Sequence, residues 1–167
     1  YIPSTDTYIE KDSAINEQID KLRLAATTNL LTRKDVIVVA SVSCIYNIGS
    51  PNEYGKFVLE LKPGVIISRQ SIMLRLIDLQ YERNDYEFSR GSFRMRGEDI
   101  DLFPAYSDYG TRIVQKNGKI EQIIEFDSHT GETIKILQGT IIFPAKHYMT
   151  DPDSYQNIFP QIRKDLA

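Results

Sequence analysis

The sequence YERNDYEFSRGSFRMRGEDIDLFP, residues 81–104, decides the fold. Apolar residues and arginines alternate over 93–96, the pair Gly97-Glu98 follows, and aspartates and apolar residues alternate over 99–102. Alternation with a period of two is typical of strands, and a two-residue loop that begins with glycine is typical of a tight turn. The stretch therefore predicts an antiparallel β-hairpin with one apolar face and one charged face.

The hairpin also predicts its own register. With Gly97-Glu98 as the loop, every residue faces a partner that suits it: Arg96 faces Asp99, Met95 faces Ile100, Arg94 faces Asp101 and Phe93 faces Leu102. A shift by one residue would bring charge onto the apolar face, so register and buried face are specified together.

The arginines of this stretch allow two interpretations. In one, Arg94 and Arg96 are cross-strand partners of Asp101 and Asp99 on a solvated face, each pair contributing about 0.2–1 kcal/mol. In the other, guanidinium groups on a rigid hairpin form a recognition surface, because arginine offers a planar fork of donors and is enriched at the energetic centres of protein interfaces. Nearby acids almost balance the arginines, which favours a protein partner over a phosphate backbone.

The flanking residues extend this unit. Alternation over 57–61 predicts a strand, and Ser68 is suited to cap a helix. The apolar positions of that helix are Ile72, Met73, Leu76 and Leu79. Further strands are predicted at 120–126, 133–137 and 140–143. Residues 57–147 are thus expected to form an α+β unit, an antiparallel sheet with a covering helix.

Asn117-Gly118 predicts another turn, and its loop length matters. A strict two-residue loop would place Ile113 opposite Gln122. A three-residue loop with a left-handed Gly118 places Val114 opposite Ile120, and is the preferred prediction.

The first 56 residues have a different pattern. Asp12 or Ser13 can cap a helix that ends near Arg33-Lys34, with apolar positions at Ile15, Ile19, Leu22, Ala26 and Leu30. The β-branched run 36–40 predicts a strand buried in a parallel sheet. Ser41 and Ser43 after it are either polar residues that end the strand or hydroxyls that hold phosphates. In the polar segment 1–12, Tyr1 and Tyr8 either stack on bases or cap a neighbouring core.

Composition limits the function further. The 167 residues are 41% hydrophobic and 26% charged, with a net charge of −3, so any contact with nucleic acid must be local. The single cysteine, Cys44, cannot form an internal disulfide, and with only His129 and His147 no zinc ligand set can be assembled. The histidines are expected to be solvated. Short apolar runs and the absence of a signal pattern fit a reducing cytoplasm and no membrane.

Several motifs together resemble the UvrB family, the damage-verifying subunits of bacterial nucleotide excision repair. These are QYERND, SRGSFRMRGE and DIDLFPAYSD, with YIPSTDTYIEKD and VIVVASVSCIYNIGSP upstream. The resemblance covers Tyr1 to Ala167 and implies a piece of a longer protein. It implies four parts: the return strand of a DNA-binding β-hairpin (1–13), a partial α/β RecA-like helicase domain (14–56), a UvrA-interaction domain (57–147) and a helical return to the RecA-like domain (148–167).

The resemblance also implies roles for individual residues. The expected contacts with acidic groups of UvrA are Arg83, Arg90, Arg94, Arg96 and Arg112. Val114 stands where the family commonly has glutamate, so that part of the surface departs from the pattern. The expected DNA contacts are Tyr1, Tyr8, Lys11, Arg23, Ser41 and Ser43.

For the parent protein, the resemblance implies ATP and Mg as cofactors, and damaged DNA and UvrC as further partners. The phosphate-binding loop would precede Tyr1, so the chain is expected to hold no cofactor and to show no ATPase activity; Gly49 to Phe57 has the wrong spacing for such a loop. Two alternatives remain: the UvrB-like module of a transcription-repair coupling factor, which also engages UvrA, and a helicase-type ATPase fragment that contacts DNA.

Overall fold

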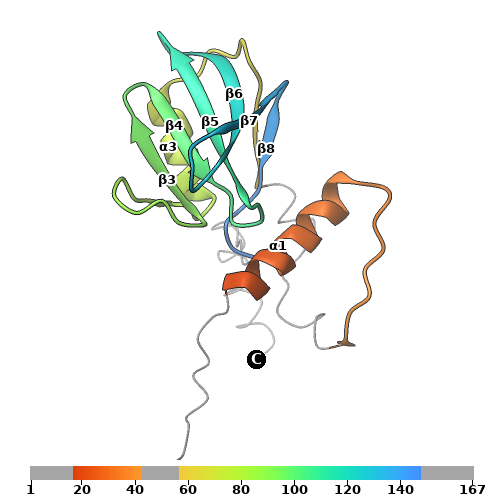
Figure 1. The fold of residues 1–167 in the computed structure, drawn as a ribbon. Helices are drawn as coiled ribbons and strands as arrows, with labels where there is room; N and C mark the ends of the chain where they lie inside the picture. Colours follow the sequence, from red (N-terminus) through yellow and green to blue (C-terminus); the bar gives the residue numbers. More distant parts are fainter. Residues whose placement is uncertain (1–16, 43–56, 148–167) are drawn as a thin grey trace, which may run out of the picture.

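The structure is a computed structural model and describes residues 17–42 and 57–147. Residues 57–147 form a sheet-rich unit, and helix α1, Glu17–Thr32, lies beside one end of it (Figure 1). This is the expected α+β class. The division into four parts stays a prediction.

The larger sheet has six strands in the order β2-β3-β4-β5-β6-β7. Its strands are β2 (Glu82–Arg83), β3 (Ser92–Arg96), β4 (Asp99–Phe103), β5 (Tyr109–Lys116), β6 (Lys119–Asp127) and β7 (Thr133–Leu137). The expected antiparallel pairing holds from β3 to β7, but the two-residue strand β2 pairs parallel to β3. A smaller sheet pairs β1, Leu59–Leu61, with β8, Thr140–Ile142.

Helix α3, Arg69–Asp78, covers one face of the larger sheet and lies behind it in Figure 1. As predicted, Ser68 caps it: the Ser68 hydroxyl accepts the N–H of Ser71 at 3.0 Å. The buried side of the helix meets the apolar face of the sheet in one core. Its fully buried side chains include Ile72, Leu76 and Leu79 from the helix region and Phe93, Ile100, Leu102, Ile113, Ile120 and Ile123 from the sheet. Helix α3 leaves the opposite face of the sheet uncovered.

The central hairpin has the predicted register. All four cross-strand pairs are formed as expected: Arg96 with Asp99, Met95 with Ile100, Arg94 with Asp101 and Phe93 with Leu102. Gly97 has a φ of 65°, the left-handed conformation that a Gly-first turn requires.

The predicted length of the loop between β5 and β6, at Asn117-Gly118, was wrong. Asn117 and Gly118 both have positive φ, 54° and 74°, and Lys116 pairs with Lys119, so the loop has two residues. Two left-handed residues make the turn whose twist matches the flanking strands. The extra residue is Glu121, which is skipped between Ile120 and Gln122 in the pairing with β5. This bulge restores the apolar pairing on the core face.

Two predictions for the N-terminal part were also wrong in their packing. Helix α1 forms, but Ile19, Leu22 and Leu30 are exposed, and its buried side chains are Lys21, Leu24 and Thr28. The run 36–40 is extended and largely exposed, and it pairs with no strand in the described part of the chain. An apolar pattern predicts an element and its face, but it does not say which other element covers that face. The beginning of the predicted helix, before Glu17, lies outside the described residues.

Candidate protein-interaction site

One row of side chains crosses five strands on the face opposite α3. Its members lie in register from β3 to β7: Arg94, Asp101, Arg112, Ile124 and Ile136. Arg96 lies two residues further along β3 and therefore shares this face. The row begins with charged residues and ends with apolar ones.

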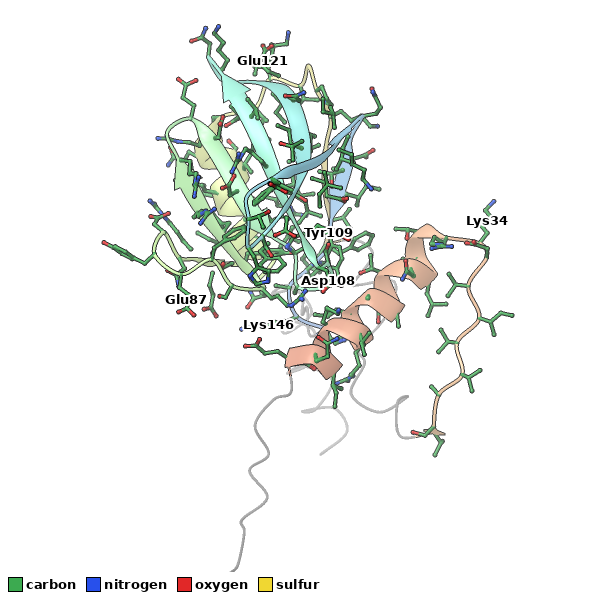
Figure 2. All side chains as sticks on the ribbon, viewed as in Figure 1. Lys34, Glu87, Asp108, Tyr109, Glu121 and Lys146 are labelled. Atoms are coloured by element: carbon green, nitrogen blue, oxygen red, sulfur yellow. The ribbon has the colours of Figure 1, made fainter. Side chains whose placement is uncertain are left out.

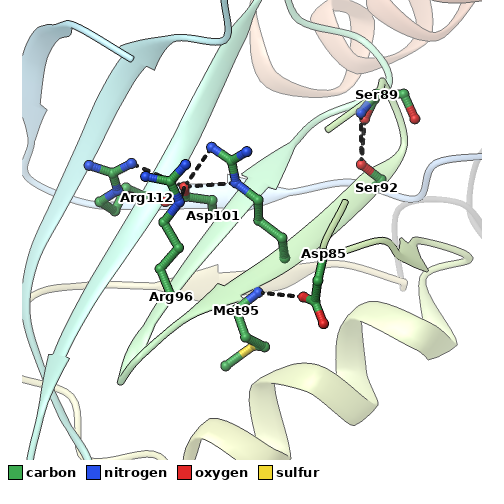
Figure 3. Close-up of polar contacts among 8 residues, drawn as sticks. Asp85, Ser89, Ser92, Met95, Arg96, Asp101 and Arg112 are labelled. Carbon is green, nitrogen blue, oxygen red and sulfur yellow. Dashed lines mark hydrogen bonds and ion pairs between the residues drawn. The ribbon is translucent and has the colours of Figure 1, made fainter. Parts of the chain in front are cut away.

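Asp101 is the centre of the charged part. Its side chain is 0% exposed and lies among three guanidinium groups (Figure 3). Arg112 donates to both carboxylate oxygens at 2.6 and 3.0 Å, Arg94 donates at 3.2 Å, and the Nε of Arg96 lies 3.4 Å from the same carboxylate. The hydrogen bonds that Asp101 accepts from Arg112 raise the pKa of Arg112 above its ordinary value. Three cations therefore surround this carboxylate, and Asp99, on the same face of β4, adds a second negative charge that also acts on Arg112. The three arginines and two aspartates still leave an excess of positive charge at this point of the face.

The guanidinium of Arg96 pairs with a different carboxylate from the one that the cross-strand interpretation gives it. Arg96 lies opposite Asp99 in the backbone register, but its guanidinium reaches diagonally to Asp101. Asp99 instead accepts the backbone N–H of Gln115 at 3.1 Å. The interpretation of the arginines as simple cross-strand pairs on a solvated face therefore misses the shared, buried acceptor.

A layer of aromatic rings supports the guanidinium groups. Phe88 stacks with Phe103 and Phe126 at centroid distances of 5.5 and 5.9 Å. Each ring carries one guanidinium: Arg94 lies over Phe88 at 4.2 Å, Arg90 over Phe103 at 5.0 Å and Arg112 over Phe126 at 4.8 Å. Cation–π contacts fix the planes of the guanidinium groups. We call Arg94, Arg96, Arg112 and Asp101, with these three rings, the arginine cluster.

Arg90 joins this layer from the side and also ties it to α1. Its guanidinium lies 2.6 Å from Asp108 and donates to the carbonyl oxygen of Ser107. Lys21 of α1 donates to the same Asp108 carboxylate at 2.9 and 3.0 Å. Hydrogen bonds from Lys21 and then Arg90 lower the pKa of Asp108. Figure 2 shows Asp108 at the end of the sheet that faces α1.

Arg83 stands apart from the other predicted residues. It lies in register with Phe93, a core residue, and its guanidinium pairs with Asp85 at 2.7 Å. The structure thus brings Arg94, Arg96 and Arg112 together at one carboxylate and leaves Arg83 at the edge of the sheet. Whether each arginine touches a partner stays a prediction.

Sequence reasoning missed three parts of this site. The alternation placed Asp101 opposite Arg94, which was a signal for an ion pair but not for burial or for three shared donors. Asp108 and the ring of Phe88 lie in irregular segments, where periodicity gives no signal for a contact.

The structure describes only two of the six residues predicted to contact DNA, Arg23 and Ser41. Tyr1, Tyr8, Lys11 and Ser43 lie outside the described residues. Arg23 is on α1, with its guanidinium 3.5 Å from Asp20, and Ser41 is exposed after the extended run. A role in DNA binding stays a prediction for all six residues.

The prediction of solvated histidines holds for His129 but not for His147. His129 is exposed in a turn, whereas His147 is partly buried. Burial, and to a lesser degree the charge of Arg23, lower the pKa of His147.

The described ranges, 17–42 and 57–147, hold no group of three or more histidine, cysteine, aspartate or glutamate side chains suited to a metal ion. Within the same ranges, no helix has the length and apolar character needed to cross a membrane.

Comparison with known proteins gives the family. Residues 59–148 match the family model described as the UvrB interaction domain. UvrABC system protein B of Carboxydothermus hydrogenoformans is 49% identical over 167 residues, 99% of this chain and 25% of the relative. The proteins of the same name from Latilactobacillus sakei and Streptococcus pyogenes are 48% identical over 168 residues. The chain spans about a quarter of the length of these relatives. The resemblance seen in the motifs is confirmed, and the chain belongs to the UvrB family, with its UvrB interaction domain at residues 59–148.

Proposed function

We propose that residues 57–147 dock this chain onto UvrA, so that the full-length protein is loaded at damaged DNA. The arginine cluster is the observation that carries the proposal. Three guanidinium groups share one buried carboxylate on the face of the sheet that α3 does not cover. The names of the relatives, UvrABC system protein B, support a role within that system.

The cluster has the properties expected of a protein interface. Each guanidinium has five N–H donors, and Asp101 takes only some of them, so donors remain for carboxylates of a partner. Because rings and a buried carboxylate already hold Arg94 and Arg112, little side-chain entropy is lost on binding. Arg96 is 56% exposed and is the most accessible cation of the three. An acidic surface of UvrA would complement this charge.

The experiment is calorimetric titration of UvrA with the chain at moderate salt. The test variant is Arg96→Glu. In this variant Asp101 still pairs with Arg94 and Arg112, so the fold is expected to be preserved. Affinity is expected to fall by about tenfold or more, since an attraction is replaced by a repulsion. A second variant, Arg83→Glu, tests whether the contact surface reaches the edge of the sheet.

The matched control is Lys34→Glu, which makes the same change of charge at an exposed residue. Figure 2 shows Lys34 beyond α1, on the side away from the sheet. Equal affinity of Lys34→Glu and the unchanged chain is expected. If Arg96→Glu binds as tightly as the control, the arginine cluster is a structural ion-pair network and the UvrA surface lies elsewhere.

For the full-length protein we further propose ATP and Mg as cofactors, and damaged DNA and UvrC as partners, in a cytoplasmic repair system. The relatives match 99–100% of this chain, including the segment 1–12, which supports UvrB over the module of a transcription-repair coupling factor. The present chain is expected to show no ATPase activity. Measurable ATP turnover by the purified chain would contradict this.

A further inference from the structure

The row that carries the arginine cluster does not end at Arg112. Ile124 on β6 and Ile136 on β7 continue it in register, and Val114 lies two residues beyond Arg112 on the same face of β5. We call Val114, Ile124 and Ile136 the apolar half of the row. Val114 and Ile124 are partly buried, and Ile136 is 59% exposed.

These three side chains lie on the face of the sheet opposite the main core and therefore do not contribute to that core. The core is built from the opposite face, where Ile113 and Ile123 are fully buried under α3. Ile134, the neighbour of Ile136 on β7, is exposed as well. Single exposed apolar residues are common, but several together beside a charged cluster are typical of an interaction site.

We propose that the surface of this chain that contacts UvrA extends along the row onto β6 and β7, and that the apolar half is part of it. The matching surface of the partner would carry acidic groups beside an apolar patch. This inference rests on the function proposed above and adds its second contact area.

The dimensions of the sheet support one continuous surface. Neighbouring strands are about 4.8 Å apart, so the four steps from β3 to β7 span roughly 19 Å. An interface of standard size buries about 800 Å² on each partner, which corresponds to a patch roughly 30 Å across. A partner centred on Asp101 would therefore cover Ile124 and Ile136 as well.

The apolar half also has a physical role beside the cations. Apolar contacts around the edge of an ion pair exclude water and lower the local dielectric constant, which strengthens the pair. The arginines would thus give orientation and fast association, and the apolar half would slow dissociation.

The test is the affinity of UvrA for Ile136→Thr, which keeps a β-branched side chain in the strand. Its matched control is Ile77→Thr on α3, where Ile77 is 51% exposed and lies on the other side of the sheet. Ile136→Thr is expected to weaken binding about fivefold to tenfold, from loss of buried apolar area. The control is expected to bind as the unchanged chain does. Circular dichroism and denaturant unfolding establish that both variants are folded.

Salt dependence separates the two halves of the surface. Arg96→Glu should reduce the dependence of affinity on salt, because an ion pair is lost, whereas Ile136→Thr should leave that dependence unchanged. Full affinity of Ile136→Thr, with Arg96→Glu still weakened, would overturn the extension onto β7 and leave the proposed function intact. If the unchanged chain did not bind UvrA at all, the proposed function itself would fail.

Discussion

Gly110 lies opposite Phe126 across strands β5 and β6, and the ring of Phe126 covers the glycine. A Cβ added at Gly110 would lie 2.5 Å from the nearest ring carbon, well inside contact distance. Gly110 is required here for space, since the same ring stacks with Phe88 and carries the guanidinium of Arg112. We expect Gly110→Ala to destabilise the fold by about 1–3 kcal/mol, as overpacking does. Urea unfolding followed by circular dichroism measures the change.

A double-mutant cycle provides the control for that prediction. Phe126→Leu alone should also destabilise, because it removes a fully buried ring. In the double variant the added methyl group has room, so the two losses should be clearly less than additive. Strict additivity would show that the ring and the glycine do not constrain each other.

Asp101 should be the acid most important for stability in this face. Asp101→Asn removes the buried charge that three guanidinium groups share, and weakening these charge-assisted hydrogen bonds should cost about 1.5–3 kcal/mol, since the arginines themselves are partly exposed. Denaturant unfolding measures the loss. Asp78→Asn is the control, because Asp78 is exposed on α3 and lies 4.0 Å from Arg75; it should change stability by less than about 0.5 kcal/mol.

The consequence of Asp101→Asn for recognition differs from its consequence for stability. The remaining guanidinium groups would keep their charge but lose a fixed position, so UvrA should still attract the variant while binding it with faster dissociation. Association and dissociation rates from surface plasmon resonance separate the two effects. An unchanged dissociation rate would show that Asp101 does not position the arginines.

Asp108 should titrate below its ordinary pKa of 3.8, with Lys21 as the main cause and Arg90 as the second. The unfolded chain binds the proton more tightly than the folded chain. The stabilising contribution of Asp108 is therefore complete above about pH 4 and is lost as the pH falls through the folded-state pKa. Carboxylate NMR titration should show that Lys21→Met moves the pKa of Asp108 back toward 3.8, and further than Arg90→Met does. A larger effect of Arg90→Met would reverse the order of the two causes.

The central hairpin was predictable because its information is local. The alternation over 93–102 and the turn at Gly97 fix strand, register and buried face together, and the helix at 69–78 has its cap and its apolar stripe in the sequence itself. The family resemblance grouped five arginines, Arg83, Arg90, Arg94, Arg96 and Arg112, as contacts of UvrA, and that role stays a prediction. Of these five, the structure brings Arg94, Arg96 and Arg112 together at one carboxylate.

Other features could not be predicted because they depend on partners distant in sequence. The shared acceptor Asp101 becomes visible only when β5 is placed beside β4 and brings Arg112 within 2.6 Å. The apolar side of α1 was predicted to be buried but is exposed. Periodicity indicates which face of a helix is apolar, but it does not show which other element covers that face. The extra residue was predicted to lie in the turn at Asn117-Gly118, whereas the structure places it at Glu121 in β6. A two-residue loop and a three-residue loop are both compatible with this sequence, and only the observed pairing of β5 with β6 decides between them.

The loop from Asn84 to Gly91 should control how firmly the aromatic layer is held. The Asn84 side-chain oxygen accepts the N–H groups of Tyr86 and Glu87 at 3.1 and 2.9 Å, and the Asn84 N–H donates to the carbonyl of Phe93 at 2.9 Å. Asn84→Ala removes the first two bonds and leaves the third. We expect faster hydrogen exchange at Tyr86 and Glu87, with a loss of stability of about 1 kcal/mol.

The effect of Asn84→Ala on recognition follows from Phe88, which lies in the same loop. Arg94 lies over the Phe88 ring at 4.2 Å, so a looser loop should hold that guanidinium less firmly and weaken UvrA binding a few-fold. Asn84→Asp is the matched variant, because a carboxylate oxygen can accept the same two N–H groups and should restore slow exchange. If Asn84→Ala left exchange unchanged but still weakened binding, Asn84 would act by direct contact with UvrA and not by holding the loop.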